Sequence, residues 1–225
     1  EVDPTNYDPN AGYDKTHFQL LAEKGEISGG QYAIKGADQR VDLIWGNNEG
    51  RGTSTIRGNL DGLALTNVVG PAQFFGTNIQ SQEVRINSGA TLTLNDAHTT
   101  IDGDLNVLQG GALGLPLSAE TLASTPVLNV TGAANLASGS SVVINAKGSD
   151  FAKGGVNYDL IKAGTLNVGS DVQIKSSSAL LSVSNVVAAD GKLNVKVATV
   201  GDDEVGEVIG DGGGNANTQA ATKAF

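Results

Sequence analysis

The sequence predicts an all-β protein folded as a right-handed parallel β-helix, a solenoid in which each coil pairs with the next. Three observations support this prediction. The 225-residue chain contains 31 glycines and only 4% aromatic residues, a composition suited to short strands joined by tight turns. Its apolar residues alternate with polar ones in short runs. Short motifs also recur at a spacing in the low twenties, which is typical of solenoid repeats.

The clearest repeated motif is the tripeptide Leu-Asn-Val. Its four copies are Leu105–Val107, Leu128–Val130, Leu166–Val168 and Leu193–Val195. The first two copies begin 23 residues apart, and the glycines of two Gly-small-x-apolar motifs, Gly89 and Gly111, are 22 apart. A period of two within each motif marks a strand with one buried face. We therefore expect short strands on coils of roughly 20 to 25 residues.

Several features complicate this pattern. Turn signals are also frequent enough for an antiparallel sandwich, which stays open as an alternative. Asp190-Gly191 is the one pair that indicates a tight hairpin between adjacent strands. The segments Phe18–Gly25 and Pro116–Ser124 interrupt the alternation, and each is expected to form a short helix or an excursion from the solenoid. The Asn- and Ala-rich residues 212–225 predict the start of a helix.

Charge and composition narrow the function classes. The net charge is −10 at pH 7, which argues against binding to DNA, RNA or an anionic membrane surface. Residues 201–211 hold five carboxylates and no base, which predicts a solvated linker. The absence of cysteine excludes disulfides and thiolate metal sites. The chain begins without methionine and stops inside the expected helix, so we interpret it as a piece of a longer protein.

Candidate catalytic groups are few. His98 lies near Asp102 and Asp104, and aspartates on one face of a β-helix can bind calcium or act as acid and base. Gly103 between them favours a turn instead. Neither His98 nor His17 has the sequence context of a Ser-His-Asp triad. We predict no catalytic, cofactor-binding or metal-binding residue.

The few aromatic residues are more readily explained by packing than by sugar binding. Trp45 and Tyr32 are expected to pack at coil corners rather than form sugar-stacking platforms. The pair Phe74-Phe75 is expected in the core, although an exposed pair would make a contact surface.

The order of these features resembles the C-terminal passenger region of bacterial type V autotransporters. The segment "VLNVTGAANLASGSSVVINA" (127–146) is similar to passenger coils, and "YDLIKAGTLNVGS" (158–170) resembles their autochaperone segment. The segment "NANTQAATKAF" (215–225) resembles the helix that leads into the outer-membrane β-barrel. The resemblance covers residues 86–225 best. It departs from the family at Val168–Val172, where an aromatic residue is usual, and residues 1–70 have no match.

The resemblance implies four segments. Residues 1–25 would be a lead-in, 26–145 the β-helix coils, 146–200 the autochaperone and C-terminal cap, and 201–225 an acidic linker and helix start. The residues expected to nucleate folding and cover the end of the solenoid are Tyr158, Leu160, Ile161, Leu166 and Val168.

The implied function is structural. The chain would be the stem and autochaperone of a passenger displayed on the bacterial surface or secreted after cleavage, in a system associated with virulence. Its partner would be its own outer-membrane β-barrel, and adhesion to a host surface or self-association stays open. This segment is not expected to be an enzyme, and it needs no cofactor, although a catalytic domain upstream stays open. The alternative is a β-helical carbohydrate-active enzyme or a tailspike-like polysaccharide-binding protein, which predicts dependence on Asp102 and calcium.

Overall fold

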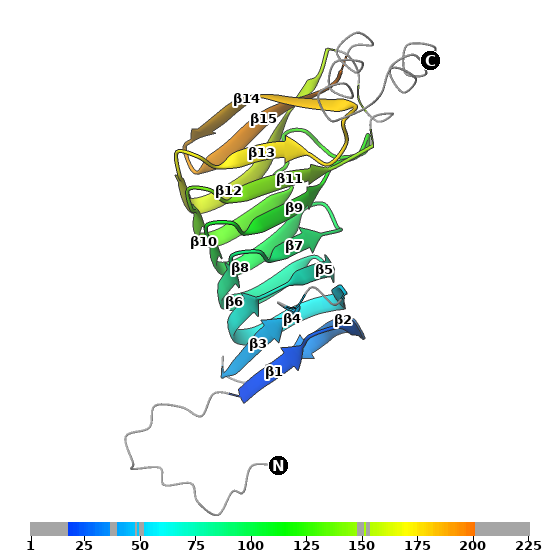
Figure 1. Ribbon diagram of the computed structural model, residues 1–225, viewed down its shortest axis with the longest axis vertical. Helices are drawn as coiled ribbons and strands as arrows, with labels where there is room; N and C mark the ends of the chain where they lie inside the picture. The colour runs from blue at the N-terminus through cyan, green and yellow to red at the C-terminus, as the bar shows by residue number, and fades with distance from the viewer. Residues whose placement is uncertain are drawn as a thin grey trace, which may run out of the picture.

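The computed structural model describes residues 18–36, 40–47, 49, 52–147, 151 and 154–200. Over these residues the protein is all-β, without a helix, and its strands form a single mixed sheet. Figure 1 shows the strands stacked along the long axis, with the first strands at one end and the last at the other. The all-β prediction is confirmed. Within the described part of the chain, no helix is long and apolar enough to span a membrane.

The sheet contains 15 strands. They are β1 (Phe18–Ala22), β2 (Gly25–Lys35), β3 (Val41–Trp45), β4 (Ser54–Val68), β5 (Pro71–Phe75), β6 (Asn78–Ile86), β7 (Thr91–Leu94), β8 (Thr99–Val107), β9 (Ala112–Pro116), β10 (Leu128–Leu136), β11 (Ser141–Asn145), β12 (Val156–Val168), β13 (Gln173–Ser176), β14 (Leu181–Ala189) and β15 (Lys192–Thr199).

Strand pairing follows two stacked series. The strands β4, β6, β8, β10 and β12 form one run of parallel neighbours, and β5, β7, β9, β11 and β13 form another, joined where β4 pairs with β5. From β5 onward, each strand of a series therefore pairs with the strand two places further along the chain. Among the described strands, only the β12–β15 and β14–β15 pairs are antiparallel. This pairing does not fit the antiparallel sandwich, whose neighbouring strands run in opposite directions.

The spacing between paired strands changes along the chain. Hydrogen-bonded side chains on adjacent strands are 22 residues apart at Gln80 and Asp102, as the sequence predicts. The spacing rises to 29 residues between Asn106 and Asn135 and to 32 between Asn135 and Asn167. The added length lies between strands, first in residues 117–127. The predicted period of roughly 20 to 25 residues therefore holds for some pairs of strands and fails for others, since paired residues are also 29 apart at Gly25 and Ser54 and 18 apart at Leu63 and Ser81.

The core is built from the alternating residues that the sequence indicates. Ile79 pairs with Ile101, which pairs with Val130, and all three are buried in a column that runs through successive strands. The four Leu-Asn-Val copies do not occupy equivalent places: Leu105 pairs with Ala134, whereas Leu128 pairs with Thr99. Similar tripeptides thus form strands at different positions around the core.

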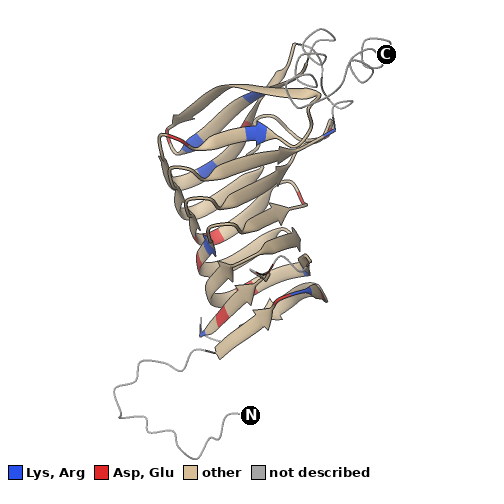
Figure 2. Ribbon diagram, viewed as in Figure 1, with Lys and Arg blue, Asp and Glu red and all other residues tan. Residues whose placement is uncertain are grey.

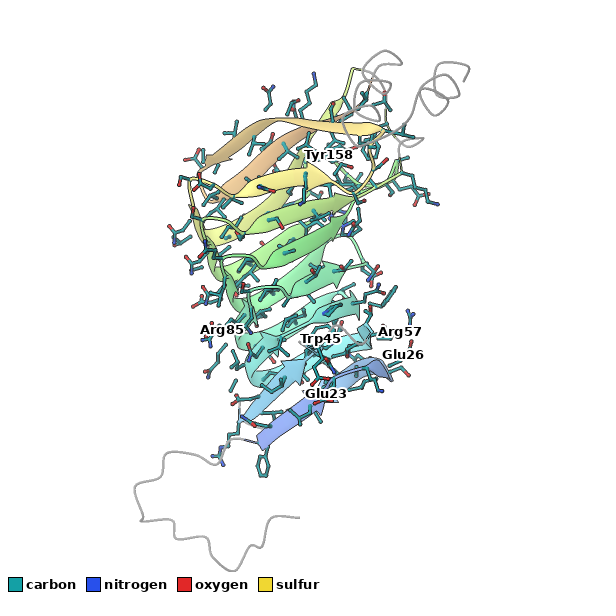
Figure 3. All side chains as sticks on the ribbon, in the orientation of Figure 1. Glu23, Glu26, Trp45, Arg57, Arg85 and Tyr158 are labelled. Atoms are coloured by element: carbon teal, nitrogen blue, oxygen red, sulfur yellow. The ribbon has the colours of Figure 1, made fainter. Side chains whose placement is uncertain are left out.

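The aromatic residues divide between core and surface. Trp45 and Phe74 are fully buried and pack edge to face, with ring centroids 6.2 Å apart, as expected for packing residues. Phe75 is half-buried under the Arg57 guanidinium, 3.8 Å from the ring centroid. Tyr32, also expected to pack at a coil corner, is 39% exposed and lies under Lys35 Nζ, 5.1 Å from the ring centroid, so it is not part of the buried core. Figure 3 shows Trp45 and Tyr158 toward opposite ends of the stack.

The two interruptions of the pattern have different outcomes. Residues Phe18–Ala22 form strand β1, which pairs in parallel with β3, so pairing at the sheet edge replaces the expected helix. Residues 117–127 have no regular strand or helix and form an excursion between β9 and β10. The acidic linker at 201–211, the helix expected in 212–225 and His17 lie outside the described residues.

Candidate functional site at the C-terminal end of the sheet

The last strands of the sheet differ from the rest, and we call β12, β14 and β15 the end unit. The second part of β12, from Ile161 to Val168, pairs in parallel with β10. Its first part, from Val156 to Lys162, pairs antiparallel with β15. One strand therefore links the parallel series to an antiparallel ribbon, and β14 lies at the outer edge of that ribbon.

The antiparallel ribbon depends on a tight turn at Asp190-Gly191. Both residues have positive φ, 51° and 72°, as a two-residue type I′ turn requires. Ala189 pairs with Lys192 directly across the turn. This confirms the hairpin that the sequence indicates at these two residues. Beyond the turn, Leu193, Val195 and Val197 alternate into the core and are completely buried.

The middle of the first part of β12 is buried on both of its faces. Tyr158, Asp159, Leu160 and Ile161 are four consecutive buried residues, whereas an ordinary strand with one solvated face alternates. The Tyr158 ring packs edge to face on Phe151, with centroids 6.0 Å apart, and its burial raises the pKa of the phenol above the ordinary value. The loop before β10 covers this segment, because Asp159 N–H donates to the Ala123 carbonyl at 3.1 Å.

A buried carboxylate connects β12 to β15. Asp159 Oδ2 accepts a hydrogen bond from Lys192 Nζ at 2.7 Å, and Oδ1 accepts one from Asn194 Nδ2 at 2.8 Å. The hydrogen bond from Lys192 lowers the pKa of Asp159, against the opposing effect of desolvation. Removal of Lys192 would leave the buried carboxylate without a counter-charge, and removal of Asn194 would leave Oδ1 without its donor; both changes are costly. The hydrogen bonds among these three side chains therefore connect β15 to β12.

The predicted capping residues occupy two environments. Tyr158, Leu160 and Ile161 lie in the first part of β12 and are buried. Leu166 and Val168 lie in the second part, where they are only half-buried while packing against the core. The difference follows from the pairing, since β15 covers the first part of β12, and no described strand pairs with the outer edge of the second part.

The carboxylates near His98 act as connections between strands. Asp102 Oδ1 accepts a hydrogen bond from Thr131 Oγ1 at 2.9 Å, and Asp104 Oδ1 accepts one from the Ala133 N–H at 2.8 Å. Gly103 bends strand β8 without ending it, with φ of 140°, so the expected turn is a bend within one strand. Among the described residues, no group of three or more His, Asp or Glu side chains could hold a metal ion.

The sequence reasoning missed Asp159, Lys192 and Asn194. The sequence does indicate that Asp159 is buried, because it stands between Tyr158 and Leu160 in an apolar segment. A buried carboxylate requires a cation or several hydrogen-bond donors nearby. Its partners, however, are 33 and 35 residues away, and a single sequence does not reveal that pairing. Comparison of the chain with protein-family models, curated proteins and solved structures found no match.

Proposed function

We propose that this chain is a right-handed parallel β-helical stem whose residues 146–200 cap the solenoid and start its folding. In this proposal the stem belongs to an autotransporter passenger, displayed on or released from the bacterial surface, and its partner is its own outer-membrane β-barrel. The two long series of parallel strands support a β-helix, because a chain that winds around one axis brings the strands of successive turns side by side.

The observation that carries the proposal is the change of pairing within β12. A parallel stack would otherwise end in an open row of backbone N–H and carbonyl groups, together with the exposed ends of its core columns. In the end unit, β15 turns back antiparallel over this edge and adds three fully buried side chains. The end unit therefore closes one part of the stack, as a cap does.

The same geometry suits a folding nucleus. The β14–β15 hairpin is local in sequence, so its loop closure costs little entropy. Once β12 is paired with β15, its other edge presents Ile161–Val168 as a template for β10. Each preceding turn then needs only its neighbour to fold, as in other repeat proteins. A chain that emerges C-terminal end first would thus fold progressively and resist slipping back.

The proposal is tested by surface display of the native full-length protein. Tyr158→Asp introduces a carboxylate at a site with 5% exposure. Burying a carboxylate that has no cation to pair with costs several kcal/mol. We expect display to fall several-fold while the amount of outer-membrane β-barrel is unchanged. The matched control is Tyr32→Asp, since Tyr32 is 39% exposed and its replacement should leave display intact. Normal display of the Tyr158→Asp variant would contradict the proposed role.

A further inference from the structure

A column of asparagines runs across three adjacent strands and ends on the second part of β12, which β15 does not cover. Asn135 Nδ2 donates to Asn106 Oδ1, and Asn167 Nδ2 donates to Asn135 Oδ1, each at 2.7 Å. At the other end, Asn106 Nδ2 donates to Glu83 Oε1 at 2.9 Å. The three amides are in register on β8, β10 and β12, so they repeat at the strand spacing of about 4.8 Å.

These amides line an open groove of 600 Å³. The groove spans the ends of β8, β10 and β12, and its second row of lining residues is Leu108, Ala137 and Gly169. Leu108 is 39% exposed and stands two residues after Asn106, so it offers an apolar wall beside the amides. Ala188 of β14 lies at the same groove. Its length therefore follows the stacking direction over three turns of the chain.

The asparagines retain hydrogen-bonding capacity toward the groove. A primary amide carries two N–H donors and an oxygen with two lone pairs. The column uses one N–H of each amide and one lone pair of Asn106 and of Asn135. The amides also cannot rotate freely, because each is fixed by its neighbours in the column. The groove thus presents a preorganised row of donors and acceptors at a regular step beside an apolar wall.

The charge of the site limits its ligand. The groove lining contains no Lys, Arg, Asp or Glu, and Figure 2 shows most of the ribbon free of charged residues. At one end of the column Glu83 is paired with Arg85, so this end carries no net charge, and it is the net charge of −10 on the chain that disfavours an anionic ligand. The backbones of β8 and β10 are paired on both edges within the sheet. Only the outer edge of β12 beyond Lys162, which has no described partner strand, would be open to a peptide strand.

We propose that this groove binds a linear, neutral glycan laid along the stack. A straight chain of sugars presents hydroxyl groups at every ring, where the amides of Asn106, Asn135 and Asn167 can pair with them. The C–H faces of the same rings pack against Leu108. Charge neutrality, an amide row and an apolar wall together match a neutral polysaccharide. The groove borders the end unit, because Leu166 and Val168 of β12 and Ala188 of β14 also line it, but its occupation does not require the proposed folding role.

The test is isothermal titration calorimetry of the whole 225-residue chain with cellohexaose, a straight β-1,4-linked glucose hexamer. Maltohexaose, the same sugar in a curved α-linked chain, is the ligand control. We expect saturable binding of cellohexaose only. Asn135→Ala should weaken it by about tenfold, because the amide and its ordered neighbours are lost. Asn129→Ala is the matched variant on the same strand β10, outside the groove, and should bind normally.

A second groove variant keeps the test independent of the asparagine column. Leu108→Asp changes an exposed side chain, leaves the amides in place and should also weaken binding by about tenfold through loss of the apolar wall. Absence of saturable cellohexaose binding, equal binding of maltohexaose, or an unchanged affinity of the Leu108→Asp variant would each overturn the proposal. An equal loss in the Asn129→Ala variant would also overturn it, since the effect would not belong to the groove.

Discussion

If the end unit starts folding, two equivalent core truncations should affect different rate constants. Ile161 lies in β12, between Leu128 of β10 and Leu193 of β15. Ile101 lies in the middle of the stack and pairs with Ile79 and Val130. Both isoleucines are completely buried, so Ile161→Ala and Ile101→Ala remove the same groups from comparable surroundings.

The two truncations should cost similar equilibrium stability. Replacing a buried isoleucine by alanine destabilises a protein by about 3 kcal/mol through lost burial and the cavity left behind. If the end unit is formed in the transition state, with a φ-value of about 0.8, Ile161→Ala slows folding about 60-fold. If the middle of the stack forms later, with a φ-value of about 0.1, Ile101→Ala slows folding by less than about twofold and mainly accelerates unfolding.

The assay is refolding from urea followed by tryptophan fluorescence. Trp45 is the single tryptophan of the chain, is fully buried against Phe74 and lies toward the end of the stack opposite Tyr158 (Figure 3). Its signal therefore reports when folding reaches the far end. Equal slowing by the two variants, or greater slowing by Ile101→Ala, would refute the idea that folding starts at β12 and β15.

Three further predictions concern the end unit and the strand bend. The lowered pKa of Asp159 contributes stability that is present above its unfolded value of about 3.9 and is lost as the pH falls through the folded value. The urea midpoint of the wild-type chain should therefore decrease as the pH is lowered below about 4. The Asp159→Asn variant should have a lower urea midpoint at neutral pH and a smaller decrease in acid. An identical acid profile in this variant would count against the role of Asp159. Gly103→Ala should destabilise the fold far more than Gly89→Ala. Both glycines have positive φ, but a Cβ at Gly103 would meet the Ser81 carbonyl oxygen, whereas one at Gly89 would meet open space. The thermal midpoints of the two variants test this, and equal decreases would argue against close packing at the bend. The isolated segment 146–200 should unfold cooperatively in urea by circular dichroism, and a flat, featureless curve would show that it is no autonomous unit.

Much of the strand content could be predicted from the sequence because alternation is a local property. Leu105 and Val107 are buried as the pattern indicates, and so are Leu193 and Val195. The position of each strand around the core could not be predicted in the same way. The excursion at residues 117–127 lengthens the spacing to 29 residues. The broken alternation at Pro116–Ser124 indicates where the excursion lies, but no local pattern reveals how the strands on either side of it pair.

The candidate site could be only partly predicted from the sequence, for a related reason. The segment around Tyr158 stands out because it does not repeat, and its residues are buried together. The half-burial of Leu166 and Val168 depends on which edge of β12 is covered, which is a property of the tertiary arrangement. The Asp159–Lys192 pair and the asparagine column likewise join residues that are about thirty positions apart. Such contacts follow from register, which a single sequence leaves undetermined.

The most direct test of the central claim is pulsed hydrogen exchange during refolding of the whole chain, read by mass spectrometry. Backbone amides in β12 and β15 should become protected first, followed by β10 and β8, and the amides of β4 should be protected last. This order would show that the end unit forms early and that the stack grows from it. Protection of β4 and β6 before β12 and β15 would contradict the account.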